Sequence, residues 1–188
     1  MILENGFLAG LLVLTDLFLV LSFYKLKKVF KFFFGLLFIV LLTAQIKTTQ
    51  FWNEYKLLPV ELDRQIQRMN QFPPSLAKLG YILEAKSEIQ ILNKLQNNFF
   101  SVFDLNFYFP NYFPFITSPL LFYGLFIFLR KKNKTLILFF VSSVLFLIIL
   151  GVHGKYGPFL IFPFFVFFII ISLGNLLNRL RKNEIKIN

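Results

Sequence analysis

Few residues in this sequence are of the kinds that perform chemistry, and three of them stand together in the stretch HGKYGP, residues 153–158. His153, the sole histidine, could serve as an acid, a base or a ligand. Lys155 could contact a phosphate, with Tyr156 beside it. The surrounding glycines and the proline that follows suit a tight chain reversal into a helix equally well. Two interpretations therefore stay open: a contact site for a ligand or lipid phosphate, or a turn alone.

A carboxylate stands in the middle of an apolar run. Asp16 lies in LLVLTDLFLVL, residues 11–21. A charge at that depth in a bilayer costs at least a few kcal/mol, so such residues often face a polar pathway or a partner. Alternatively, a protonated Asp16 bonds Thr15 or a neighbouring helix, or lies close enough to the interface to be hydrated.

Several kinds of chemistry are excluded by what the sequence lacks. It has no cysteine, which excludes disulfides, thiolate catalysis and cysteine-ligated metals. A single histidine is too few for the usual histidine metal sites. No P-loop, dinucleotide fingerprint, G-x-S-x-G or zinc spacing occurs. We therefore assign no catalytic residue and expect neither a metal nor a cofactor.

The elements that must position these residues are long apolar segments. The 188 residues are 57% hydrophobic, with a mean hydropathy of +0.69. Each apolar run approaches the roughly 17–25 residues that cross about 30 Å of hydrocarbon as a helix, although the second is short and need not span fully. The runs cover residues 6–23, 32–46, 113–129, 135–152 and 158–177. We expect an all-α, polytopic membrane protein with about five transmembrane helices.

The basic residues explain the formal net charge of +11 and predict the threading of the chain. Every second boundary between apolar runs is basic, and such boundaries face the cytoplasm under the positive-inside rule. The residues are Lys25, Lys27, Lys28, Lys31, Arg130, Lys131, Lys132, Lys134, Arg179, Arg181, Lys182 and Lys186. We expect the protein to lie in the plasma membrane. Its N-terminus is then outside the cell and its C-terminus in the cytoplasm. A topology signal of this kind does not indicate nucleic acid binding.

Four regions follow from this threading. Residues 1–46 form a transmembrane hairpin of two helices, and residues 113–178 hold the other three. Residues 179–188 are a basic cytoplasmic tail. Residues 47–112 form an extracytoplasmic, helical and amphipathic segment between helices two and three.

The extracytoplasmic segment is expected to hold two or three short helices. Pro59 suits a helix start that runs to Met69, and residues 75–86 form a second helix with Ser75 as its N-cap. A third helix begins near Ser87 and carries Leu92, Leu95 and Phe99 at helical spacing. About 65 residues are few for an independent core, so this apolar face is a candidate contact for the membrane surface, for the other helices or for a partner.

Two resemblances add to these patterns. The stretch QFPPSLAKLGYILEAKSEIQILNKLQNNFFSVFDLNFYF, with the basic hairpin and GPFLIFPFF after it, resembles a group of uncharacterised polytopic membrane proteins of bacteria, over residues 60–170. The stretch KYGPFLIFPFF is similar to late spans of polyprenyl-phosphate-sugar-dependent glycosyltransferases. That second resemblance implies that Lys155 and Tyr156 contact the phosphate of a lipid-linked donor. The acidic residues of that family's first extracytoplasmic loop have no counterpart here.

Two functions from different classes are consistent with the sequence. The favoured one is a non-catalytic integral membrane protein, a subunit or accessory factor that binds a membrane or envelope protein through residues 47–112. The alternative is an enzyme that handles lipid-linked sugars or lipid phosphates, or a fragment of a glycosyltransferase-like enzyme. In that case the site would lie near His153, Lys155 and Tyr156.

Overall fold

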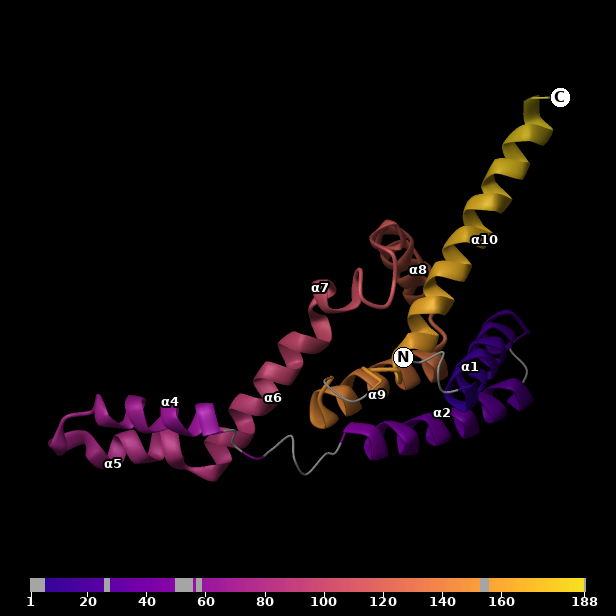
Figure 1. Cartoon of the computed structure of the whole chain (residues 1–188). Coiled ribbons are helices and arrows are strands. Elements are labelled where there is room, and N and C mark those ends of the chain that lie inside the picture. The colour runs from indigo at the N-terminus through magenta and orange to yellow at the C-terminus, as the bar shows by residue number, and fades with distance from the viewer. Residues whose placement is uncertain (1–5, 26–27, 50–55, 57–58, 153–155, 188) are drawn as a thin grey trace.

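The computed structural model describes residues 6–25, 28–49, 56, 59–152 and 156–187, and all regular secondary structure in these ranges is helical. Five helices form one body, and a hairpin of further helical elements extends from it (Figure 1). The helices of the body are α1 (Gly6–Lys25), α2 (Lys28–Thr49), α8 (Ser118–Arg130), α9 (Lys134–Leu150) and α10 (Phe162–Ile187).

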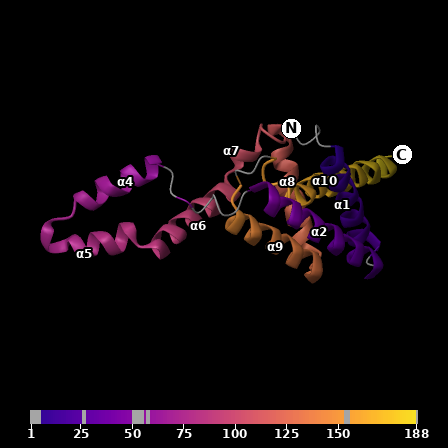
Figure 2. The same cartoon turned by 60° about the horizontal axis from the view of Figure 1, so that its bottom comes forward.

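The hairpin and the connection back to the body lie between residues 59 and 117 and comprise seven helical elements. They are α4 (Pro59–Asn70), η1 (Pro74–Leu76), α5 (Ala77–Gly80), the π-helical η2 (Tyr81–Ala85), α6 (Ser87–Phe103), α7 (Leu105–Tyr108) and η3 (Phe115–Thr117). Helix α4 packs against α5 and η2, and α6 runs from the hairpin to α9. Figures 1 and 2 both show the α4–α5 end standing away from the body.

Among the described residues, three helical segments are long and apolar enough to cross a membrane. They are Gly6–Tyr24, Lys28–Thr49 and Phe162–Arg181. The helix expected to be short, α2, is 22 residues long, which at about 1.5 Å per residue exceeds the hydrocarbon thickness of about 30 Å. The other two apolar segments, Phe115–Arg130 and Lys134–Leu150, are shorter. These lengths and compositions indicate a membrane protein.

Phenylalanine rings fill the interior of the body. Phe23 of α1 meets Phe167 of α10 with ring centres 5.0 Å apart, and Phe34 of α2 meets Phe164 at 6.0 Å. Phe128 of α8 lies 5.2 Å from Phe168. Helix α10 therefore contributes rings to contacts with three helices. Aromatic pairs at such distances add about 0.5–1.5 kcal/mol each beyond the burial of their area.

Helices α8 and α10 approach each other closely at one glycine. A Cβ atom added to Gly124 would lie 1.9 Å from the carbonyl oxygen of Phe168. Among the described residues, the hydroxyl of Ser172, one turn along α10, donates to the carbonyl of Leu120 at 2.5 Å. Small residues at helix interfaces allow this kind of backbone contact in membrane proteins.

Two expectations about the last spans need correction. Helix α10 begins at Phe162 rather than at Pro158, because residues 157–161 form a buried, non-helical segment. By sequence, Pro163 and Pro119 fall inside the apolar runs 158–177 and 113–129, where a proline would kink a helix. Each instead is the second residue of its helix, where a missing N–H costs no intrahelical hydrogen bond.

Candidate functional site

The turn between α9 and α10 was the first candidate site, and the structure describes only part of it. His153 and Lys155 lie outside the described residues. Tyr156 is half-buried and packs against the apolar core of the body. The expected contacts of His153, Lys155 and Tyr156 with a phosphate or other ligand therefore stay predictions.

The segment that follows Tyr156 is held by a glutamine of α2. Gln45 is fully buried; its Nε2 donates to the carbonyl of Gly157 at 3.1 Å, and its Oε1 accepts from the N–H of Leu160 at 3.2 Å. Non-helical backbone at membrane depth is tolerated only where protein or water satisfies its polar groups. One side-chain amide thus supplies a donor and an acceptor to the chain just before α10.

Sequence reasoning missed Gln45, although a signal was present. The buried face of α2 consists of Phe34, Phe38, Leu41, Gln45 and Thr49, at helical spacings of three and four. An amide that continues an apolar stripe toward the core must find buried partners. Its position near the end of the span made it resemble an ordinary interfacial residue.

Two tyrosines line the same turn from the α7 side. A Cβ atom on Gly157, whose φ is +73°, would lie 2.2 Å from the hydroxyl oxygen of Tyr112. Tyr112 packs on Phe162 at 4.9 Å between ring centres, and Tyr108 packs on Phe165 at 5.0 Å. The Tyr108 hydroxyl is buried and has no hydrogen-bond partner among the described residues.

These tyrosines are neutral groups at ordinary pH. Burial, together with the neighbouring Tyr112, raises the pKa of Tyr108, and burial raises the pKa of Tyr112. Neutral phenols can donate hydrogen bonds but supply no general base. Across the described residues, no group of three His, Asp or Glu side chains is placed to hold a metal ion.

Asp16 is half-buried within α1. Its Oδ1 atom is buried and has no hydrogen-bond partner among the described residues. Thr15, one of the partners expected for it, donates its hydroxyl to the carbonyl of Leu11 at 2.7 Å instead. Among the described residues, Asp16 therefore has neither a hydrogen bond from Thr15 nor an ion pair with a cation. A functional role for Asp16 stays a prediction.

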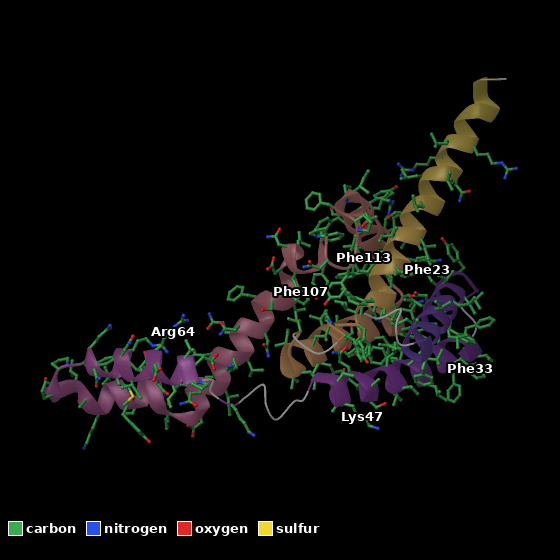
Figure 3. The ribbon with its side chains drawn as sticks, in the orientation of Figure 1. Phe23, Phe33, Lys47, Arg64, Phe107 and Phe113 are labelled. Atoms are coloured by element: carbon green, nitrogen blue, oxygen red, sulfur yellow. The ribbon has the colours of Figure 1, made fainter. Side chains whose placement is uncertain are left out.

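The hairpin has polar side chains on the inside. Arg68 of α4 pairs with Glu84 of η2, with Nε and Oε2 2.7 Å apart, and Lys94 of α6 pairs with Glu61 at 2.9 Å. Gln65 is buried and donates to the carbonyl of Glu84. A polar cavity of about 430 Å³ lies among these residues. Figure 3 shows Arg64, which also lines it, among the polar side chains of the hairpin.

The large apolar side chains of the hairpin lie on its outside. Within the described part of residues 59–97, no large hydrophobic side chain is buried. Thirteen large hydrophobic residues between positions 60 and 103 are instead between 45% and 61% exposed. They are Val60, Leu62, Ile66, Leu76, Leu79, Tyr81, Ile82, Leu83, Ile91, Leu92, Phe99, Phe100 and Phe103.

The three residues of α6 expected to bind a partner differ in their exposure. Leu92 is 58% and Phe99 45% exposed, so both remain available, whereas Leu95 is half-buried. The adjoining side of α6 packs on α9, where Asn98 Nδ2 donates to the carbonyl of Ile148 at 3.1 Å and Val102 is buried. The structure thus leaves Leu92 and Phe99 outward and holds α6 to the body through Asn98.

No protein-family model, curated protein or solved structure matches this chain. Its function must be argued from its own geometry.

Proposed function

We propose that this chain is a non-catalytic, multi-pass protein of the plasma membrane that serves as a subunit or accessory factor of a membrane or envelope assembly. The hairpin from α4 to α6 binds the protein partner. One observation carries the proposal: the hairpin joins its helices through ion pairs and exposes thirteen large apolar side chains. An exposed apolar surface of this kind marks an interaction site.

In the proposed threading, all five helices of the body cross the membrane, with the N-terminus outside and the C-terminus in the cytoplasm. Hydrogen bonds that join helix ends support it. At the basic ends, Lys31 Nζ donates to Asn133 Oδ1 at 3.3 Å and Lys131 Nζ donates to the carbonyl of Phe23 at 3.0 Å. At the opposite ends, Gln45 of α2 bonds the chain before α10. Helices α8 and α9 cross by local thinning of the bilayer.

Single cysteines test this threading, because the natural chain has none. Asn97 and Lys132 are exposed, whereas Asn133 is buried and unsuitable for labelling. A membrane-impermeant maleimide should label Asn97→Cys in intact cells and Lys132→Cys only after permeabilisation. The reverse pattern would overturn the orientation.

The charge and placement of the hairpin favour a protein partner over the lipid surface. Residues 59–104 carry five basic and five acidic side chains, so they lack the basic excess that draws a segment to anionic lipid. Figures 1 and 2 show the α4–α5 end directed away from α10 and beyond the end of α2. The partner is an envelope protein with an apolar groove or helix face, and it is recognised as in other helix-in-groove contacts.

A photo-crosslinking experiment on the full-length protein in its native membrane tests the partner site. A photoreactive residue at Leu92 or at Phe99 should crosslink one and the same protein. A photoreactive residue at Asn97, an exposed polar position of the same helix, should not crosslink that protein. That protein should co-purify in stoichiometric amount and be lost from Leu92→Glu/Phe99→Glu but not from Asn97→Glu. Crosslinks to lipid alone, or equal recovery from all variants, would overturn the proposal.

A further inference from the structure

A second pocket lies between α8 and α10, where these helices carry basic residues. Its volume is about 250 Å³. The lining includes the cations Arg130, Lys131 and Arg179, the polar side chains Tyr123 and Asn175, and the ring of Phe126. No carboxylate is among the lining residues.

Within the described part of the chain, the cations of this pocket lack a counter-charge. Among the described residues, neither Arg130 nor Arg179 has an ion-pair partner. Lys131 is engaged elsewhere: its Nζ donates to the carbonyl of Phe23 and lies 3.9 Å from the centre of that ring. Carbonyls at the end of α8 attract Arg130. Two guanidinium groups that share a pocket repel each other unless an anion joins them.

A polar atom in the pocket also lacks a partner. The Tyr123 hydroxyl is buried and makes no hydrogen bond within the described part of the chain. The guanidinium carbon of Arg179 lies 5.9 Å from the centre of the Tyr123 ring, so the two groups face the same space. Buried hydroxyls are nearly always hydrogen-bonded, and a bound acceptor would satisfy this one.

The position of the pocket suits a lipid headgroup. Arg179 lies near the end of the apolar segment Phe162–Arg181, and Lys131 is bonded to the end of α1. The ring of Phe126 is 60% exposed beside the cations, where acyl chains would pass. Pockets for drug-sized ligands measure about 300–1,000 Å³, so this one matches a headgroup whose chains remain outside.

We propose that this pocket binds the phosphate group of an anionic phospholipid. Arg130 and Arg179 hold the phosphate oxygens, Tyr123 and Asn175 donate hydrogen bonds, and the acyl chains lie along Phe126. Arginine suits this task because its planar donors match phosphate oxygens in pairs. Basic pockets between membrane helices recognise anionic lipids in this way.

Native mass spectrometry of the full-length protein, released from nanodiscs of equal parts phosphatidylglycerol and phosphatidylcholine, tests the proposal. The wild type should retain one phosphatidylglycerol in preference to phosphatidylcholine. Arg130→Gln/Arg179→Gln should retain it at least about tenfold less, because two charged contacts are lost. Tyr123→Phe should show a smaller loss in the same direction. Lys132→Gln/Arg181→Gln removes two nearby exposed cations that do not line the pocket, and should match the wild type.

A second arm distinguishes lipid from free phosphate. Inorganic phosphate is added to the protein in a detergent without phosphate groups. Binding of inorganic phosphate that is lost in Arg130→Gln/Arg179→Gln, without preference for phosphatidylglycerol, would support the phosphate site with a soluble ligand as its source. Equal lipid retention by all variants with no phosphate binding would overturn the proposal. Equal losses in the pocket variant and in Lys132→Gln/Arg181→Gln would also overturn it, because general surface charge would then explain the binding.

Discussion

The body and the hairpin distribute their apolar side chains in opposite ways. The body packs Phe23 and other rings inside, and half-buried Phe113 adds to that packing near the hairpin (Figure 3). It also exposes apolar residues such as Phe32 on its surface. The hairpin joins its helices through ion pairs and Gln65, and leaves its large apolar residues outward. An apolar exterior suits a lipid environment, whereas the hairpin lies where only another protein would cover it in our proposal. In our proposal, exposed residues of the same apolar type thus contact lipid in one region and a protein partner in the other.

The largest test of this comparison replaces a buried glutamine in each region. Gln45→Leu removes one of two hydrogen bonds to the carbonyl of Gly157, which still accepts from the N–H of Phe159 at 3.0 Å. It also leaves the N–H of Leu160 without a partner among the described residues, at a cost of about 1–3 kcal/mol. Gln65→Leu removes a single bond, to the carbonyl of Glu84, and should cost less. Thermal unfolding of both variants in one detergent measures the difference. Equal losses would mean that Gln45 does not hold the turn before α10.

Close packing in the body gives the second test. Gly124→Ala forces a methyl group against the Phe168 carbonyl and should separate α8 from α10, at a cost of about 1–3 kcal/mol or more. Gly10→Ala is the matched control, because no atom lies within 4 Å of an added Cβ there. That control should be neutral or slightly stabilising, since alanine favours helix over glycine. If Gly124→Ala is as stable as the wild type, α8 and α10 do not pack this tightly.

A third test concerns Tyr108, whose buried hydroxyl has no partner among the described residues. Tyr108→Phe should leave the protein as stable or stabilise it by about 1 kcal/mol, because an unsatisfied polar group is removed. Burial raises the pKa of Tyr108, so the unfolded chain loses this phenol proton at a lower pH than the folded protein does. The free energy of unfolding is therefore unaffected by this group below the usual tyrosine pKa of about 10 and falls as the pH rises above it. Unfolding temperatures measured from pH 8 to 11 should therefore fall less in the variant. Parallel curves would contradict the buried phenol.

The smallest effect is expected at the ion pairs inside the hairpin. Arg68→Ala removes the contact with Glu84, and because Arg68 is 54% exposed the loss should be about 0.2–1 kcal/mol. Hydrogen exchange should rise in α4 and η2 without a change in the body. Arg64→Ala, which lines the same cavity but has no ion pair among the described residues, serves as the control. High salt should reproduce part of the Arg68 effect in the wild type.

Local patterns predicted the elements whose shape depends on nearby residues. Helix α4 was expected from Pro59 to Met69 and ends one residue later, because Pro59 and the apolar spacing act within a few turns. The helix expected over residues 75–86 is a continuous run of helical turns over residues 74–85, divided into η1, α5 and the π-helical η2. Ser75 lies inside η1 rather than at an N-cap. A Cβ on Gly80 would lie 2.8 Å from the Phe72 ring. Such a contact shapes the chain through packing that spacing alone does not reveal.

Long-range polar contacts were the part that the sequence could not reveal. Leu92 and Phe99 were identified by helical spacing, but the burial of Leu95 depends on how α6 meets α9. The basic boundary residues were identified as a topology signal. That Arg130 and Arg179 share a pocket follows only from the packing of α8 on α10.

The bonds of Gln45 have a consequence for the order of biosynthesis. Gly157 and Leu160 follow it by 112 and 115 residues, and Lys131 follows Phe23 by 108. A ribosome adds about 5–20 residues per second, so the first two helices wait on the order of 5–20 seconds for these partners. During that interval the Gln45 amide must be satisfied by water or by the insertion machinery. In the proposed threading, α1 and α2 thus enter the membrane before the residues that complete their contacts have been made.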